Sequence, residues 1–151
     1  MEELTAFLQA QTIMQIAPQS ETPWIANLLM VAESPRALYF VGSERTHYGQ
    51  LLRATGTVAF ATAWHASDNH TDRKGVQGVG VAHTVSDHDE IAHVVSLHNA
   101  AYPEFREQIT PDWVSTNTIG IHLWRIEPTF IKFWNDALYG RDGCTTFTFE
   151  H

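Results

Sequence analysis

Short runs of β-forming residues, separated by turn signals, occupy most of the chain and restrict it to an antiparallel fold. The runs cover residues 12–18, 23–33, 37–42, 57–64, 75–86, 115–134 and 144–150. Ser34, Pro35 and Arg36 mark a turn after the second run and predict a hairpin. Three glycines in the fifth run predict a bulge or a close approach of another backbone. The sixth run fits either two strands or one bent strand.

Helical spacing separates some of these runs. Apolar residues of segments 2–9 and 48–52 share one helical face. A capping-box pattern around Asp87 predicts a helix from Asp87 to Ala101, ended by Pro103. Closure of the strands would remove exposed sheet edges. The sequence therefore predicts an α+β, mainly β protein, a six-stranded antiparallel barrel with two to three helices.

Composition limits the partners and the location. The length of 151 residues fits one domain, residues 1–151. A formal charge of −8 disfavours nucleic acid, although four basic residues between Arg45 and Lys74 leave room for a small anion. A lone cysteine, Cys144, and an acidic start predict a cytoplasmic protein. No apolar run approaches the ~20 residues that cross a bilayer, so no membrane span is expected.

The stretch from Leu38 to Leu52, "LYFVGSERTHYGQLL", changes from strand to helix spacing through a turn that suits an anion. Backbone N–H groups at a helix start bind phosphate well when Ser, Thr and Arg side chains join them. The turn supplies these types and a histidine: Ser43, Arg45, Thr46 and His47. The alternative is that Ser43 or Thr46 only caps the helix while Arg45 and His47 face water. Local spacing leaves both open.

The order of the segments resembles the pyridoxamine 5′-phosphate oxidase-like flavoproteins, the FMN-binding split β-barrels. The resemblance covers most of the chain and rests on "PWIANLLM", "LYFVGSERTHYGQLL", "VAFATAW", "KGVQGVGVAHTVS" and "IEPTFIKFW". It implies a split barrel, an FMN cofactor and a homodimer with the cofactor at the interface. It also implies a small-molecule substrate or electron donor, and FMN-dependent oxidoreductase chemistry.

The same resemblance implies roles for particular residues. It implies ring contacts for Ala26, Asn27, Phe40 and Val41, phosphate contacts for Ser43, Arg45, Thr46 and His47, further flavin contacts for Lys74 and Gln77, and a ring cover from the other subunit for Trp134. His47 stands where the family usually has lysine, which weakens the positive charge near neutral pH. The alternatives are a solvated Lys74, an outward-facing Gln77 and a core Trp134.

Other chemistries have weaker support. His83, His88, His93 and His98 recur every five residues and so spread around a helix, and no metal site is expected. Cys144 has no neighbouring base, and no catalytic residue is assigned. Arg141 lacks a histidine two positions later, so vitamin B6 oxidation is not expected. Two alternatives to a flavoenzyme remain open, a non-catalytic FMN or haem carrier and a purely structural barrel.

Overall fold

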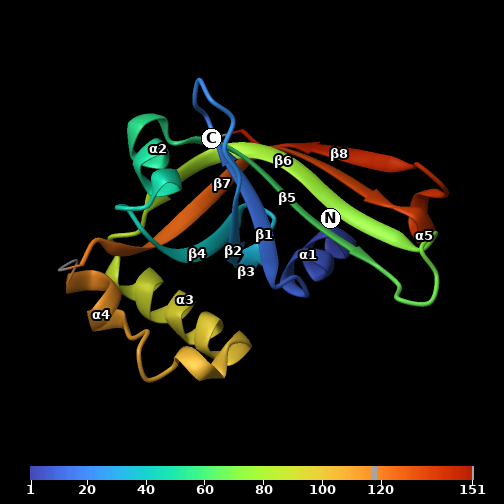
Figure 1. Ribbon diagram of the computed structural model, residues 1–151. Helices are drawn as coiled ribbons and strands as arrows, with labels where there is room; N and C mark the ends of the chain where they lie inside the picture. The colour runs from blue at the N-terminus through green and yellow to red at the C-terminus, as the bar shows by residue number, and fades with distance from the viewer. Residues whose placement is uncertain (117–118, 151) are drawn as a thin grey trace.

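A single curled antiparallel sheet forms the body of the protein in this computed structural model, which describes residues 1–116 and 119–150 (Figure 1). Its strands are β1 (Ile13–Pro18), β2 (Ala26–Leu29), β3 (Val31–Ser34), β4 (Ala37–Ser43), β5 (Thr57–His65), β6 (Arg73–Thr84), β7 (Ile121–Asn135) and β8 (Cys144–Thr148). Their order is β2-β1-β5-β6-β7-β4-β3, with β8 paired to β7. The predicted antiparallel sheet is confirmed; it curls into a half-barrel with β2 and β3 at its two edges, so the order of the described strands does not close as the sequence predicts.

The strand number is eight within the described residues, and the prediction of six was wrong. The run 23–33 divides at Met30, which is fully buried and whose N–H bonds to the carbonyl of Thr12. Before this point the chain pairs with β1, and after it with β4, so one apolar run supplies both edges of the sheet. The alternation of apolar and polar residues cannot show that one run passes from one edge of the sheet to the other. The sixth run is one long strand, β7, and a register shift at Val79/Gly80 confirms the predicted bulge.

Five α-helices occur in the described residues, where two to three were predicted. They are α1 (Glu2–Gln9), α2 (His47–Thr55), α3 (His88–Ala101), α4 (Pro111–Thr116) and α5 (Asp136–Tyr139), with a 3₁₀ turn η1 (Pro103–Phe105). The Asp87 side chain caps α3 by accepting from Glu90 N, as the capping box predicts. The last two α-helices, α4 and α5, are too short for their apolar residues to show a helical repeat in the sequence. None of the described helices has the length and apolarity to cross a bilayer.

The inner, concave face of the sheet carries the core. Leu4, Phe7 and Leu8 of α1 pack into the larger cluster, which includes Phe60 and Phe133 from the strands. A second cluster joins α3, α4 and η1 to β3, β4 and β7. In Figure 1, α3 and α4 lie together below the sheet, and α2 lies beside the end of β4. This arrangement leaves α2 and its preceding turn at the rim of the barrel.

The outer face of the sheet is unusually apolar. One row of paired residues crosses four strands and consists of Ala17, Ala59, Val79 and Phe130. Val79 and Phe130 are 44% and 37% exposed. The alternation that sends Val58 and Phe60 inward therefore sends small and apolar residues, not charged ones, outward.

Candidate functional site

The turn between β4 and α2 is organised by its own hydroxyl groups. Thr46 is the N-cap of α2; its Oγ1 accepts from Gly49 N at 3.1 Å and donates to the Ser43 carbonyl at 2.7 Å. Ser43 Oγ accepts from Arg45 N at 3.1 Å. Both hydroxyl groups are thus engaged in shaping the backbone, which fixes the direction of the first N–H groups of the helix.

Two of those N–H groups remain available. The backbone nitrogens of His47 and Tyr48 make no hydrogen bond to any described residue. The side chains of Arg45 and His47 are exposed beside them, and the Trp24 ring meets the His47 ring edge-on at 4.7 Å between centroids. Free N–H groups at a helix start with a guanidinium beside them have the chemistry that binds a phosphate.

A carboxylate within the turn is already neutralised. Glu44 Oε2 accepts from Arg53 Nη2 at 2.7 Å and lies 2.8 Å from His122 Nε2. Hydrogen bonds from Arg53, and then from His122, lower the pKa of Glu44 below its ordinary value. The Arg53 guanidinium also lies over the Trp124 ring, 5.6 Å from its centroid. Because Arg53 and His122 neutralise the Glu44 carboxylate, it repels an anion at Arg45 less than a free carboxylate would.

The turn also approaches its neighbours closely enough to require glycine. A Cβ on Gly49 would overlap the Ser43 carbonyl oxygen and crowd the Glu44 backbone. Gly120 has φ +72°, its carbonyl accepts from Glu44 N at 2.8 Å, and a Cβ there would crowd the Arg45 side chain. These contacts tie the turn to the start of β7.

No local sequence pattern indicates this anchoring. Glu44 and Arg53 are nine residues apart, and their partner His122 is 78 residues from Glu44. His122 is 5% exposed and sits among apolar strand residues, where its sequence position suggests only core. Pairing of β4 with β7, which places Gly42 opposite His122, brings the group together.

Other expected flavin contacts lie on different parts of the sheet. Ala26 is partly buried and Asn27 is exposed on β2, while Val41 is partly buried on β4. Phe40 is fully buried and stacks on Trp124 at 5.9 Å between centroids, so its side chain has no surface for a ligand. Its alternation in β4 sends it into the core.

Lys74, Gln77 and Trp134 belong to the far end of β6 and β7. Lys74 pairs with Asn135, and Gln77 pairs with Lys132. Strand alternation places Lys74 and Gln77 on opposite faces, so the structure does not bring these two expected contacts together. Trp134 is partly buried over Gly75, where a Cβ would overlap its ring.

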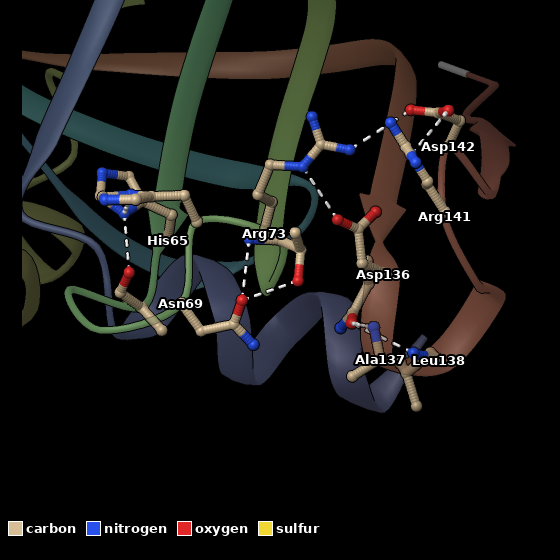
Figure 2. A network of polar contacts seen from close by, with 12 residues as sticks. His65, Asn69, Arg73, Asp136, Ala137, Leu138, Arg141 and Asp142 are labelled. Carbon is tan, nitrogen blue, oxygen red and sulfur yellow. Dashed lines mark hydrogen bonds and ion pairs between the residues drawn. The ribbon is translucent and has the colours of Figure 1, made fainter.

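An ion-pair network closes this far end (Figure 2). Arg73 Nε donates to Asp136 Oδ2 at 2.9 Å, and Arg73 Nη2 donates to Asp142 Oδ1 at 3.3 Å. The same guanidinium lies 5.9 Å from the centroid of the Trp134 ring. Trp134 therefore contacts Arg73 and Gly75 of β6 on one side and pairs with Cys144 of β8 on the other.

Both ends of β7 therefore carry expected flavin contacts. Ile121 pairs with Ser43 at the turn, and Trp134 lies thirteen residues further along the strand. At ~3.3 Å per residue that is roughly 40 Å measured along the strand, which curls with the sheet. The turn and the Trp134 of the same chain therefore lie at opposite ends of β7.

Comparison with known proteins identifies the fold. Neither a protein-family model nor a curated protein matches the chain. A haem-binding protein from Mycobacterium smegmatis is similar, with a TM-score of 0.70 and 16% identity over 92% of this chain and 53% of that one. A candidate pyridoxamine 5′-phosphate oxidase from Listeria innocua has a TM-score of 0.65 and 15% identity, over 89% and 97%. An FAD-binding protein from Mesorhizobium loti has a TM-score of 0.65 and 16% identity, over 86% and 90%.

These likenesses define the class of fold. The curled antiparallel sheet is the split barrel of the pyridoxamine 5′-phosphate oxidase-like proteins, as the order of sequence segments implies. At these identities the likeness establishes the fold alone. The ligand has to be argued from this chain's own residues.

Proposed function

We propose that this protein binds FMN and acts as an oxidoreductase of the pyridoxamine 5′-phosphate oxidase-like type on a small molecule. The observation that carries the proposal is the β4–α2 turn, where the free N–H groups of His47 and Tyr48 lie beside the exposed Arg45. A terminal phosphate fits these donors. The likeness to an FAD-binding protein and to a candidate pyridoxamine 5′-phosphate oxidase supports a flavin as the molecule that carries this phosphate.

The chain's own residues would bind and orient the cofactor. Arg45 and the two N–H groups would hold the phosphate, with the Thr46 cap fixing their direction. Trp24, 46% exposed, would shield the phosphate from water on the His47 side. When bound, the flavin itself supplies hydride or electron transfer, so no side chain needs to act as an acid or base.

We further propose that two copies of the chain build each site. The apolar outer row that ends in Val79 and Phe130 is suited to a two-fold interface between sheets. A partner laid on this face would bring its own Trp134 toward the flavin held at Arg45, whereas the Trp134 of the same chain lies at the other end of β7. The expected assembly is a homodimer with two equivalent sites.

A haem carrier on the same scaffold is the second candidate, supported by the likeness to the haem-binding protein of Mycobacterium smegmatis. Absorbance of the purified protein separates the two ligands, because flavin and haem have distinct visible spectra. Bleaching by NADH or NADPH without oxygen then separates an enzyme from a carrier.

The phosphate assignment is tested by titrating FMN into the full chain and an Arg45→Ala variant. Loss of a charge-assisted hydrogen bond, about 1.5–3 kcal/mol, predicts an affinity roughly tenfold to a hundredfold lower. Arg106→Ala is the matched control, because Arg106 is exposed and makes no ion pair with any described residue. Equal affinity in Arg45→Ala and Arg106→Ala would remove Arg45 from the site.

The shared-site model is tested by sedimentation with flavin bound. We expect a dimer at low micromolar concentration. A 17.0 kDa species that retains flavin would show that one chain suffices, and the interface would have to be abandoned.

A further inference from the structure

A cavity of about 500 Å³ opens at the far end of the half-barrel, on the inner face of the sheet. It lies between α1, the ends of β5, β6 and β7, and α5. Figure 2 shows this corner, where α1 (blue) passes beneath Ala137 and Leu138. Lys74 lines the cavity, whereas Gln77 faces the outer side. The cavity is therefore separate from the β4–α2 turn proposed for the flavin phosphate and from the outer face proposed for the dimer interface.

The cavity exists because one stripe of α1 carries small side chains. Ala6 and Ala10 alternate with Glu3 and Phe7 at helical spacing, and all four line the cavity. Phe7 is buried against Phe133, at 5.5 Å between centroids, and forms part of the floor. Phe7 thus anchors the helix to the sheet, while the small side chains of Ala6 and Ala10 leave the space of the cavity open beside it.

Large apolar side chains complete the walls without filling the space. Trp64 is 42% exposed and Leu138 is 49% exposed, although both line the cavity. Exposed surface of this size at the mouth of a cavity suits an apolar or aromatic body.

Two hydrogen-bond donors sit side by side at the inner end. Lys74 and Asn135 are direct cross-strand partners of β6 and β7, and both line the cavity. The Lys74 ammonium lies over the Trp64 ring, 5.0 Å from its centroid, and no carboxylate of the described residues is within ion-pair distance of it. A cation without a counter-charge at an apolar cavity favours an anionic ligand.

Asn135 supplies the second donor. Its side chain is almost fully buried, at 5% exposure for the residue. Oδ1 accepts from Ala137 N and Leu138 N at 3.1 and 3.2 Å, which fixes the oxygen and leaves Nδ2 as the free group. Nδ2 donates to no described residue. An ammonium and an amide donor next to each other match the two oxygens of a carboxylate.

The carboxylate of Glu3 also lines the cavity, but its negative charge does not cancel the positive charge of Lys74. Its side chain is 59% exposed and lies 4.0 Å from the N-terminal ammonium, so solvent and that cation screen it. The donors Lys74 and Asn135 instead belong to the sheet floor.

We propose that this cavity binds a small aryl carboxylate. Lys74 Nζ and Asn135 Nδ2 hold the carboxylate, and the ring lies between Trp64, Phe7 and Leu138. The site goes beyond flavin binding and does not depend on it, because it uses the inner face of the sheet.

The test titrates the full-length protein with 1-naphthoate and with 1-naphthalenemethanol, its neutral analogue of similar shape, following binding by calorimetry. We expect saturable binding of naphthoate, about tenfold or more tighter than that of the alcohol, because only the anion gains the charge-assisted bonds. Equal affinities, or no saturable binding of naphthoate, would overturn the proposal.

Matched variants locate the site. Lys74→Gln should abolish the preference for the anion, while Lys132→Gln, which changes the only other lysine of the chain and faces the outer side, should retain it. Ala6→Leu adds a side chain at an exposed helix position and should block both ligands by filling the cavity. Retained preference in Lys74→Gln would contradict the proposal even if Ala6→Leu proved unstable. FMN affinity, measured in parallel, reports separately on the flavin proposal.

Discussion

The two ends of β7 treat charge in opposite ways. At the start of the strand, Glu44, Arg53 and His122 form a closed group in which the carboxylate contacts both nitrogen partners within 2.8 Å. At the far end, Lys74 makes no ion pair with any described carboxylate and lies next to Asn135, whose amide nitrogen is free; Glu3, which also lines the cavity, contacts the N-terminal ammonium instead. The start of β7, the closed end, completes its charge network inside the protein. The far end, the open end, pairs Arg73 with Asp136 and Asp142 on its outer side but leaves the Lys74 and Asn135 donors without acceptors among the described residues.

The difference explains how each end can bind an anion. At the β4–α2 turn, Arg53 and His122 neutralise the charge of Glu44. The carboxylate therefore does not compete for the backbone N–H groups of the turn, which stay free and point in a fixed direction. At the cavity, the absence of a counter-ion among the described neighbours of Lys74 leaves its own charge available. The first solution gives geometric precision, and the second gives electrostatic attraction.

The largest effect should come from disturbing the closed end with Gly49→Ala. Alanine favours helices over glycine by about 1 kcal/mol, but its Cβ would overlap the Ser43 carbonyl and the Glu44 backbone, which have little freedom to move. Overpacking of this kind typically costs 1–3 kcal/mol, and occasionally more. Because the overlap is with backbone atoms we place the cost at the upper end, and after the helix-propensity gain we expect a net loss of about 1–2 kcal/mol in the free energy of unfolding, with weaker FMN binding. Chemical denaturation measures it. A variant as stable as the parent would show that the turn can relax.

At the open end, Asn135→Ala should cost about 1 kcal/mol, the usual value for loss of a helix cap, because Ala137 N and Leu138 N lose their acceptor. Asn135→Asp sharpens the comparison, since aspartate is an equally good cap but has no amide donor. We expect near-parental stability in Asn135→Asp together with loss of naphthoate binding. Naphthoate binding equal to that of the parent would mean that the amide nitrogen does not contact the ligand.

Much of the fold could be predicted because its signals are local. The capping box before α3 and the turn after Ser34 depend on residues a few positions apart, and the structure confirms both. The division of one apolar run at Met30 could not be predicted, since it depends on which strand each half pairs with.

The candidate site divides in the same way. The strand-to-helix turn and its Thr46 cap follow from the stretch that encodes them. The pairing of Glu44 with His122 depends on the register between β4 and β7. The placement of Lys74 and Gln77 on opposite faces follows from alternation along β6. The register depends on where the loops and bulges fall in the folded sheet, which the local sequence does not determine. The assigned flavin contacts remain predictions.

A smaller, pH-dependent effect should distinguish the closed end. The pKa of Glu44 is lower in the folded protein than its ordinary value of 4.5, chiefly because Arg53 donates to it. The ionised form is therefore favoured by folding, so its stabilisation is fully present above about pH 4.5 and is lost as the pH falls through the folded pKa. Glu44→Gln should lower the Tm near neutral pH, and the difference from the parent should shrink as the pH falls below the ordinary pKa of 4.5. A difference that stays constant over this range would mean that Glu44 does not contribute through its charge.

The smallest effect should come from Arg141, the most exposed arginine of the open end. Its side chain is 91% exposed, and its contact with Asp142 measures 3.9 Å. Exposed pairs of this kind contribute little because solvent screens them and ordering two long side chains costs entropy. We expect Arg141→Ala to leave the Tm unchanged within error at low and high salt. Arg53→Ala is the counterpart at the closed end: it removes two hydrogen bonds to Glu44 and the stacking on Trp124, and should lower the Tm measurably. Equal shifts in the two variants would show that the network around Glu44 is no stronger than a surface contact, and the contrast between the two ends of β7 would then be one of geometry only.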